Sequence, residues 1–445
     1  MRYRNNENLY VGEVNGFGYA FIPGGKNGIV LLDLETKKLL DQMPERQPTD
    51  EKRIKLLYEK EIIRLETDPL RPTPILDAKK VSSIGIWLHL TNSCNLACPY
   101  CYIVNKGPNQ HMPLSTAKVC LEKIEETVHK HQLKMVTIRL AGGEPTLYED
   151  AVHFFVEEMK NRFSSKGVAA KCVLITNGTI LNSKWCEFLS ANSISVSLSL
   201  DGMGEWHNQT RFFSNGKGSF SSVMTGISNC KRYQIIPTIL TTITEDNLPG
   251  IPALAKFLID EGLPFRFNAF RNCRNNNTNY LNFIDALINA LGQCYDYYAF
   301  AIREGKASFK HQLAEIHIDR RTHLRSCGMG HSGMAIDNTG KVFLCQAKMD
   351  AEPIGKLQDS STLLEMAWNQ NTIPDLRGKS VFDYEDCRHC QWAPICGGGC
   401  PIVNSVAHGM ATKASPYCKL FKNMIPRLIE LKALSLISKF SLERR

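Results

Sequence analysis

The sequence predicts an α/β fold: an incomplete (β/α)6 TIM-like barrel, with a small β-rich unit before it and a cysteine-rich unit after it. Between residues 84 and about 304, six short apolar runs alternate with helix-compatible stretches, the pattern of repeated βαβ units around a parallel sheet. Of the 16 cysteines, ten fall into tight groups. At 445 residues the chain exceeds one ordinary core, and we expect units at 1–80, 81–309 and 310–445.

The N-terminal unit is predicted to contain short strands and one charged helix. Residues 9–34 carry apolar runs separated by glycine turns, and the helix is expected within 49–66. The segment TDPLRPTP at 67–74, with three prolines, predicts a linker. Two uses of this unit are open: its edge strand could capture an extended peptide, or the unit could cap the barrel.

The barrel prediction depends on six strands and the helices that follow them. The strands are IGIWLHL at 84–90, MVTIRL at 135–140, CVLIT at 172–176, ISVSLSL at 194–200, IIPTILTTI at 235–243 and PFRFNAF at 264–270. Helices are expected to begin near Leu114, Glu149, Ser183, Phe220, Leu248 and Tyr280. In parallel barrels the chemistry lies at the C-terminal ends of the strands, so residues directly after each run become site candidates.

The cysteine-rich unit after residue 310 is expected to be stabilised by bound metal rather than by a core of its own. Its last segment, from about Lys419 to Phe440, predicts an amphipathic helix that packs on the protein. The six cysteines outside the groups are predicted to be buried small hydrophobic residues. They are Cys120, Cys172, Cys186, Cys230, Cys273 and Cys294.

Composition narrows the class of protein. The hydrophobic share of 43% and the charged share of 22% are ordinary for a globular chain. No run of about 18 apolar residues occurs and the N-terminus has no signal region, so we predict a cytoplasmic protein without a membrane partner. The net charge of +9 is scattered, without the basic and aromatic clusters of a nucleic-acid site. It suits either a solvated surface or an acidic peptide substrate.

Three cysteines follow the first predicted strand in the loop TNSCNLACPYCY. Cys94, Cys98 and Cys101 have the spacing C-x3-C-x2-C. A structural zinc site normally closes with a fourth Cys or His, and the nearest candidate is His111, ten residues further on. A cubane cluster with three protein thiolates keeps one iron open for a substrate or cofactor.

A second motif, AGGEPTL, follows the next strand and therefore lies at the same end of the barrel. It contains Gly142, Gly143, Glu144 and Pro145, whose glycines allow backbone to approach a ligand. GGEP by itself could be a turn. With C-x3-C-x2-C followed by the aromatic Tyr102, it resembles the radical S-adenosylmethionine (SAM) superfamily over about residues 84–304.

This resemblance implies a cofactor site and a reaction. The three cysteines would hold a [4Fe-4S] cluster whose open iron binds SAM, and an electron donor of flavodoxin or ferredoxin type would reduce it. Cleavage of SAM would give a 5′-deoxyadenosyl radical that takes a hydrogen atom from substrate, while the protein positions the reactants. The residues implied to contact SAM are Tyr102, Gly142, Gly143, Glu144, Asn177 and Ser199.

Seven later cysteines resemble the SPASM domain, an extension of radical SAM enzymes that act on peptides or proteins. Its interlaced pattern implies two auxiliary [4Fe-4S] clusters, so that the chain would hold three in total. One would bind Cys387, Cys390, Cys396 and Cys418, and the other Cys327, Cys345 and Cys400. A zinc ribbon is the alternative for Cys387, Cys390, Cys396 and Cys400.

The second auxiliary cluster is one ligand short, because no cysteine stands beside Cys327. The fourth position could be open, taken by substrate, or filled by His331, Cys273 or Cys294.

Two further features concern the substrate. The segment DGMGEWHNQTRFFSNGKGSF contains His207 and Arg211, which are either catalytic candidates or part of a surface loop. Anaerobic sulfatase-maturing enzymes, which the chain also resembles, carry an Asp after the cysteine matching Cys345, where it acts as a base. This chain has Gln346, and an amide cannot accept that proton.

Three functions are therefore weighed. The first is a maturase that uses a carbon radical to oxidise, crosslink or form a thioether in a ribosomal peptide or a protein side chain. The second is a small-molecule dehydrogenase or epimerase with the same auxiliary domain. The third is an iron–sulfur scaffold or sensor, which would not need the SAM motif GGEP together with its three cysteines.

Overall fold

A computed structural model describes residues 2–69, 76–77, 80–103, 106–163, 167–273, 280–308, 316, 318 and 322–442. Residues 70–74 of the predicted linker lie outside the described residues. Within the described ranges, no helix is both long and apolar enough to cross a membrane.

The N-terminal unit is built on an antiparallel sheet in the order β2-β3-β4, with strands Tyr10–Val14, Phe17–Phe21 and Ile29–Leu32. Two helices follow, α1 (Leu34–Asp41) and α2 (Glu51–Glu59). Asp33 caps α1 by accepting a hydrogen bond from the Thr36 amide at 2.6 Å.

The predicted helix within 49–66 is α2, but it ends earlier than the charged run does. Glu61 has a φ of +59°, a left-handed conformation that does not continue a helix. The next residues form β5 (Ile63–Leu65), which pairs antiparallel with β1 (Tyr3–Asn5).

The barrel strands confirm the predicted α/β fold. All six are parallel and neighbour one another in chain order. They are β6 (Ser83–Thr91), β7 (Met135–Gly142), β8 (Ala169–Thr176), β9 (Ser195–Ser199), β10 (Thr238–Ile243) and β11 (Phe265–Ala269).

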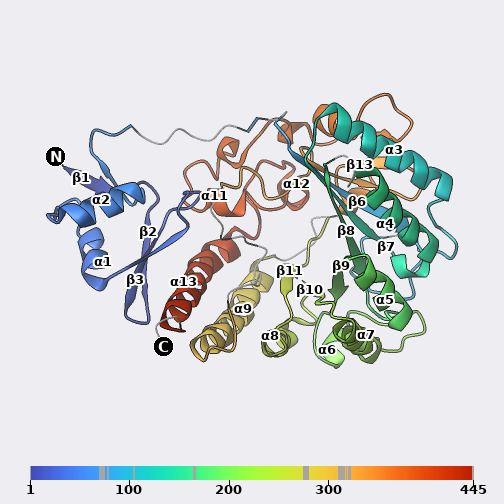
Figure 1. Cartoon of the computed structure of the whole chain (residues 1–445), viewed down its shortest axis with the longest axis horizontal. Helices are drawn as coiled ribbons and strands as arrows, with labels where there is room; N and C mark the ends of the chain where they lie inside the picture. The colour runs from blue at the N-terminus through green and yellow to red at the C-terminus, as the bar shows by residue number, and fades with distance from the viewer. Residues whose placement is uncertain are drawn as a thin grey trace.

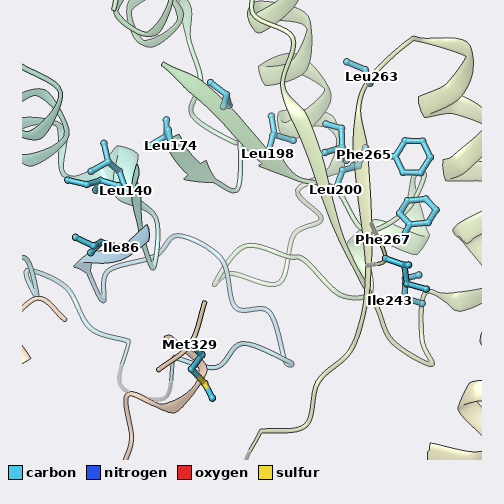
Figure 2. Close-up of a cluster of buried hydrophobic side chains, with 14 of the residues drawn as sticks. Ile86, Leu140, Leu174, Leu198, Leu200, Ile243, Leu263, Phe265, Phe267 and Met329 are labelled. Carbon is cyan, nitrogen blue, oxygen red and sulfur yellow. The ribbon is translucent and has the colours of Figure 1, made fainter. Parts of the chain in front are cut away.

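Alternating burial along these strands separates a core face from an open face. Ile84, Ile86 and Leu88 on β6 are buried, whereas Gly85 and Trp87 between them are partly exposed. Figure 2 shows the buried side chains Ile86, Leu140, Leu174 and Leu198 succeeding one another across β6 to β9. The residues at alternate positions therefore line the concave side of the incomplete barrel.

Six helices of the barrel begin at or near the predicted residues. They are α3 (Leu114–Lys130), α4 (Glu149–Phe163), α5 (Ser183–Ala191), α7 (Phe220–Arg232), α8 (Ile251–Asp260), which follows a 3-10 turn at Leu248–Gly250, and α9 (Tyr280–Arg303). The short helix α6 (Glu205–Asn208) was not predicted. Helices α3, α4, α5 and α7 lie along the outer side of the sheet (Figure 1).

The C-terminal unit extends the barrel sheet. Its strand β12 (Gly333–Ile336) pairs parallel with β6, and β13 (Lys341–Phe343) and β14 (Gly355–Lys356) follow antiparallel, which gives nine strands in all. Helices α10 (Leu363–Asn369), α11 (Ala393–Cys396), α12 (Pro401–His408) and α13 (Cys418–Leu442) complete it.

The apolar interior of the C-terminal unit is larger than the sequence led us to expect. Leu363, Val403 and Leu428 are buried in the same continuous core as the barrel strands. Sheet extension explains this, because the pairing of β12 with β6 joins the C-terminal unit directly to the barrel sheet. Metal is therefore not the sole source of stability here, and the unit boundary at 309/310 stays a prediction.

Helix α13, at the C-terminal end of the chain, packs against the N-terminal unit. It packs along α9 and contacts β2 and β4 of the N-terminal sheet. In Figure 1, α13 and α9 lie side by side between the N-terminal unit and the barrel strands. A separate contact joins the N-terminal sheet to the segment before α11: the rings of Tyr10 on β2 and Trp392 meet edge to face, with centroids 5.4 Å apart. The predicted C-terminal helix thus packs on the protein.

Candidate active site

Backbone hydrogen bonds connect the cysteine loop to GGEP at the C-terminal end of the barrel. The Gly143 amide donates to the Thr91 carbonyl at 2.7 Å, and the Glu144 amide donates to the Ser93 carbonyl at 2.8 Å. A Cβ on Gly142 would lie 2.4 Å from the Thr91 oxygen, and one on Gly143 would lie 2.2 Å from the Ser93 oxygen. Both glycines are therefore needed for the close approach of the two backbones.

Glu144 is a buried organiser of this end of the barrel. Its carboxylate accepts hydrogen bonds from the Thr146 amide at 3.1 Å, the Thr176 hydroxyl at 2.7 Å and the Asn177 amide at 2.7 Å. Burial raises the pKa of Glu144, and these hydrogen bonds oppose that shift. Because its side chain is 0% exposed and engaged by protein atoms, it fixes the turn after β7 to the end of β8.

Asn177 ties the end of β8 to the cysteine loop. Its side-chain Nδ2 donates to the side-chain Oδ1 of Asn95 at 2.8 Å, and Asn95 Nδ2 donates in turn to the Thr179 hydroxyl at 2.8 Å. Ser199 is the last residue of β9 and is partly exposed on the concave side. The predicted SAM contacts thus come from the ends of β7, β8 and β9, next to the loop that carries Tyr102.

Asp201 is a site residue that the sequence analysis missed. It is 0% exposed and accepts hydrogen bonds from the Tyr100 hydroxyl, from Arg211 Nε at 2.8 Å and from the Thr242 amide at 3.0 Å. The Arg211 guanidinium also lies over the Tyr100 ring, 5.5 Å from its centroid. Asp201 lies two residues beyond the C-terminal end of β9, in the region that the barrel rule marks as functional.

His207, in contrast, is held inside the protein. It is 0% exposed; Nδ1 accepts from the Asp201 amide at 3.1 Å, and Nε2 lies 3.0 Å from the Ser219 hydroxyl. Burial lowers the pKa of His207 to about 4, so it is neutral at physiological pH. The structure brings Arg211 to the cysteine loop, and it uses His207 to brace the segment that carries Arg211.

The thiols of the loop lie among charged side chains. Burial raises the pKa of Cys94 to about 11; Glu144 and Cys98 also raise it, and Lys106 lowers it. Burial likewise raises the pKa of Cys98, while Arg211 and Lys106 act in the opposite direction. Lys106 also donates to the Leu96 carbonyl at 3.1 Å. The two cations favour the thiolates that a metal centre requires.

The C-terminal cysteines separate into two neighbourhoods. Burial first, and then the proximity of Cys396, Cys418 and Cys390, raises the pKa of Cys387 to about 12. The same thiols act on one another in the shifts of Cys396 and Cys418. Around Cys345, burial raises the pKa to about 12, and Cys400 and Cys327 add to it. The thiols thus group as four and three, in the interlaced order of the sequence.

Three consecutive glycines separate the two groups. Gly397, Gly398 and Gly399 have φ values of +58°, +83° and +76°. Added Cβ atoms would lie 2.4 Å from the Arg325 backbone, 2.6 Å from the Tyr384 ring and 2.4 Å from Ser415. This left-handed run turns the chain so that Cys396 and Cys400 reach different thiol groups.

Arginines on the concave side form a second feature that the sequence analysis missed. Arg139 and Arg266 occupy open-face positions of β7 and β11. Burial, with Arg271 and Arg139 nearby, lowers the pKa of Arg266 to about 10. Among the described residues, Arg266 Nε is buried without a hydrogen-bond partner. In the sequence, the only indication that Arg266 belongs to the site is its position on the last predicted barrel strand.

These donor sets fit iron–sulfur clusters. Thiolates are the usual ligands of such clusters, and the structure gathers them in three places. In the described part of the chain, no three Cys, His, Asp or Glu side chains converge as a single metal ion needs. A cubane binds each thiolate at a different iron, so its ligands surround a volume instead of meeting at a point.

Family profiles match two parts of the chain. The radical SAM superfamily profile matches residues 88–258, and the profile of the iron-sulfur cluster-binding SPASM domain matches residues 327–391. Together with the incomplete barrel, these matches show that the chain is a radical SAM protein with a C-terminal SPASM domain. Its cofactors are SAM and [4Fe-4S] clusters, auxiliary clusters included.

Among curated relatives, the chain resembles cysteine-type anaerobic sulfatase-maturating enzymes. It is 27% identical to the one from Clostridium novyi, over 76% of this chain and 93% of that protein. It is 26% identical to the one from Clostridium perfringens strain ATCC 13124, over 77% and 96% respectively.

Two solved structures share the fold. Native anSMEcpe with bound AdoMet and Cp18Cys peptide has a TM-score of 0.64 at 21% identity, and the match covers 79% of this chain and 99% of that chain. Streptococcus suis SuiB bound to its precursor peptide SuiA has a TM-score of 0.55 at 15% identity, and the match covers 93% and 98%.

Proposed function

We propose that this protein is a radical SAM maturase that modifies a side chain of a ribosomal peptide or a protein by oxidation, crosslinking or thioether formation. One observation carries the proposal. Backbone hydrogen bonds join the loop with Cys94, Cys98 and Cys101 to GGEP at the C-terminal end of a barrel, and among the described residues no fourth Cys or His acts on Cys94 or Cys98. A cluster on three thiolates would keep an iron open for SAM.

The residues around the loop would hold and orient this cofactor. Tyr102, Gly142, Gly143, Asn177 and Ser199 would line the SAM site. Glu144 would act through the turn it fixes, since its buried carboxylate already accepts hydrogen bonds from protein atoms. When bound, the cluster and SAM supply a carbon-centred radical that removes a hydrogen atom from substrate.

The remaining cysteines would bind two auxiliary clusters. Support comes from their neighbourhoods: Cys387, Cys390, Cys396 and Cys418 form one, and Cys327, Cys345 and Cys400 belong to the other. Tyr102 links the second to the radical site, because both Cys101 and Cys345 contribute to raising its pKa after burial. Substrate would thus lie between two metal centres, with a flavodoxin- or ferredoxin-type donor supplying electrons.

A peptide substrate is supported by the N-terminal unit. Its strand β2 is a sheet edge, and Asn8, Tyr10, Asp41 and Gln391 line an open polar hollow beside it. An extended peptide could add to such an edge. The fold match to SuiB, a protein solved with its precursor peptide, extends over 93% of this chain.

The concave side would favour an acidic residue of that peptide. Arg139 and Arg266 face the space into which substrate must reach, and Arg266 Nε is buried without a hydrogen-bond partner among the described residues. A carboxylate is the group that a buried guanidinium binds best. The net charge of +9 would assist its approach.

Sulfatase maturation is the second candidate, favoured by identity of 26–27% over nearly the whole length of the named relatives. Gln346 weakens it. The Cys345 thiol lies 3.5 Å from Gln346 Oε1, at the position where a carboxylate base would stand. A small-molecule substrate is the remaining alternative. It is supported by 29% identity to the Fe-coproporphyrin III synthase of Methanosarcina barkeri, over 43% of that protein.

Anaerobic co-expression with small peptides encoded beside the gene, followed by mass spectrometry, tests the proposal. We expect one of them to lose two hydrogen atoms, about two mass units, and a triple variant Cys94→Ala, Cys98→Ala, Cys101→Ala to leave it unchanged. A sulfatase-derived Cys or Ser peptide serves as comparison. Conversion of that peptide, with the neighbouring peptides untouched, would replace the proposal by its second candidate.

A further inference from the structure

One auxiliary thiol group has four members and the other, by its sequence pattern, has three. The sequence does not decide the fourth ligand of the group with Cys327, Cys345 and Cys400. That position could stay open, bind substrate, or be filled by His331, Cys273 or Cys294. These choices differ in chemistry, because a cluster with an open iron can bind substrate, whereas a fully ligated one only exchanges electrons.

The segment directly after β11 packs against the C-terminal unit. The Tyr417 hydroxyl donates to the carbonyl of Phe270, just beyond the last strand residue Ala269. Ala269 and Arg271 line a small cavity together with Cys400 and Tyr417. Cys273 is two residues further on and is 8% exposed. A residue of the barrel unit is thereby brought beside the three-cysteine group.

The thiol of Cys273 is in electrostatic contact with that group. Burial raises the pKa of Cys273 to about 12, and the next largest influence is Cys400. Reciprocally, Cys273 is among the groups that raise the pKa of Cys345 after burial, alongside Cys400 and Cys327. Arg271, two residues before Cys273, lines the same small cavity as Cys400, so the chain around Cys273 lies against the three-cysteine group.

The other two candidates are placed elsewhere. Cys294 is 0% exposed on α9, burial raises its pKa, and among the described residues no cysteine acts on it. His331 Nε2 lies 3.4 Å from the Asp77 carbonyl. Burial lowers the pKa of His331, and the further groups acting on it are Asp77 and Arg325, not a cysteine.

We propose that Cys273 is the fourth protein ligand of the cluster held by Cys327, Cys345 and Cys400. This inference rests on the proposed function, which assigns those three cysteines to a cluster. It makes both auxiliary clusters fully protein-ligated and leaves the open iron to the Cys94, Cys98 and Cys101 site. Substrate then cannot bind iron at an auxiliary cluster, and these clusters serve electron transfer.

Cys273→Ala and Cys294→Ala form a matched pair, since each removes one buried thiol. Both variants and the wild type are reconstituted anaerobically, and iron, sulfide and the electron paramagnetic resonance of the reduced clusters are measured. We expect Cys294→Ala to match the wild type. Cys273→Ala should lose about four iron atoms per chain, or keep a cluster whose spectrum changes when potassium cyanide is added.

A second measurement leaves Cys273 in place and so does not depend on the folding of its variant. The triple variant Cys94→Ala, Cys98→Ala, Cys101→Ala should keep two clusters whose spectra do not respond to cyanide. A response there, or identical iron and spectra in Cys273→Ala and Cys294→Ala, overturns the inference. Wild-type protein without iron–sulfur clusters would instead refute the proposed function itself.

Discussion

At the scale of the residue, His207 links stability to pH. It is buried and neutral, and burial lowers its pKa to about 4, against about 6.5 in an unfolded chain. A depressed pKa means that the unfolded state takes up the proton first. The stabilising contribution is therefore complete above pH 6.5 and is lost as pH falls toward 4.

His207→Gln should remove part of this dependence. Between pH 7.5 and 5.5 the wild type should lose about 1 kcal/mol of unfolding free energy through His207, because one pKa unit corresponds to about 1.4 kcal/mol. Anaerobic urea unfolding at both pH values measures it. If the variant loses as much stability as the wild type over that interval, His207 is not the group that titrates.

Arg266 and Arg325 are two partly buried arginines, and replacing each in turn shows whether it serves substrate binding or structure. Arg325 donates to the carbonyls of Lys379 at 2.8 Å and Leu376 at 2.9 Å, so Arg325→Met should cost about 1–3 kcal/mol. Arg266 Nε has no such partner in the described part of the chain. Arg266→Met should therefore leave thermal stability equal or higher, while peptide modification is lost. Destabilisation equal to that of Arg325→Met would make Arg266 a structural residue.

The sequence revealed these residues unevenly. Glycine and cysteine spacing located the loop and GGEP, because both motifs depend on backbone that packs closely and on thiols at fixed intervals. Asp201 and Arg266 escaped notice, since their importance comes from burial and from neighbours on other strands. Cys273 could be named as a candidate, but its neighbours Cys345 and Cys400 are more than 70 residues away in the chain.

At the scale of the element, the glycine run between Cys396 and Cys400 is the most sensitive segment. Gly397 and Gly409 both have positive φ, at +58° and +74°. A Cβ on Gly397 would press on the Arg325 backbone, whereas one on Gly409 meets nothing within 4 Å.

Gly409→Ala should cost about 1 kcal/mol, the strain of the left-handed conformation. Gly397→Ala adds a backbone clash and should cost clearly more, with loss of iron from the C-terminal unit. Thermal unfolding and iron content of the two variants give the comparison. Equal behaviour would mean that the loop relaxes freely, and that the glycines do not separate the two thiol groups.

Elements were predicted well where their pattern is local. The strands β6 to β11 are short apolar runs bounded by turns, so their positions follow from the sequence to within a few residues. The pairing of β12 with β6 did not follow from it, because the two strands are separated by more than 200 residues. Helix α1 was also missed, since it directly follows a strand and its apolar residues blend with that run.

At the scale of the whole molecule, the metal content distinguishes iron–sulfur clusters from zinc at the three thiol groups. Three [4Fe-4S] clusters require about twelve iron and twelve sulfide per chain after anaerobic reconstitution. Air should bleach the protein as the clusters oxidise. Elemental analysis that found tightly bound zinc with little iron, or a colourless protein stable in air, would contradict the assignment of all three thiol groups.

The most direct test of the central claim is 5′-deoxyadenosine formation by the triple variant Cys94→Ala, Cys98→Ala, Cys101→Ala. SAM is cleaved only where an iron lacks a protein ligand, and we assign that iron to this loop. Under dithionite, the wild type should form 5′-deoxyadenosine from SAM. The variant should form none, while roughly eight iron atoms remain in the auxiliary clusters. If the variant still produced 5′-deoxyadenosine, the radical-generating site would lie elsewhere and the account would be wrong.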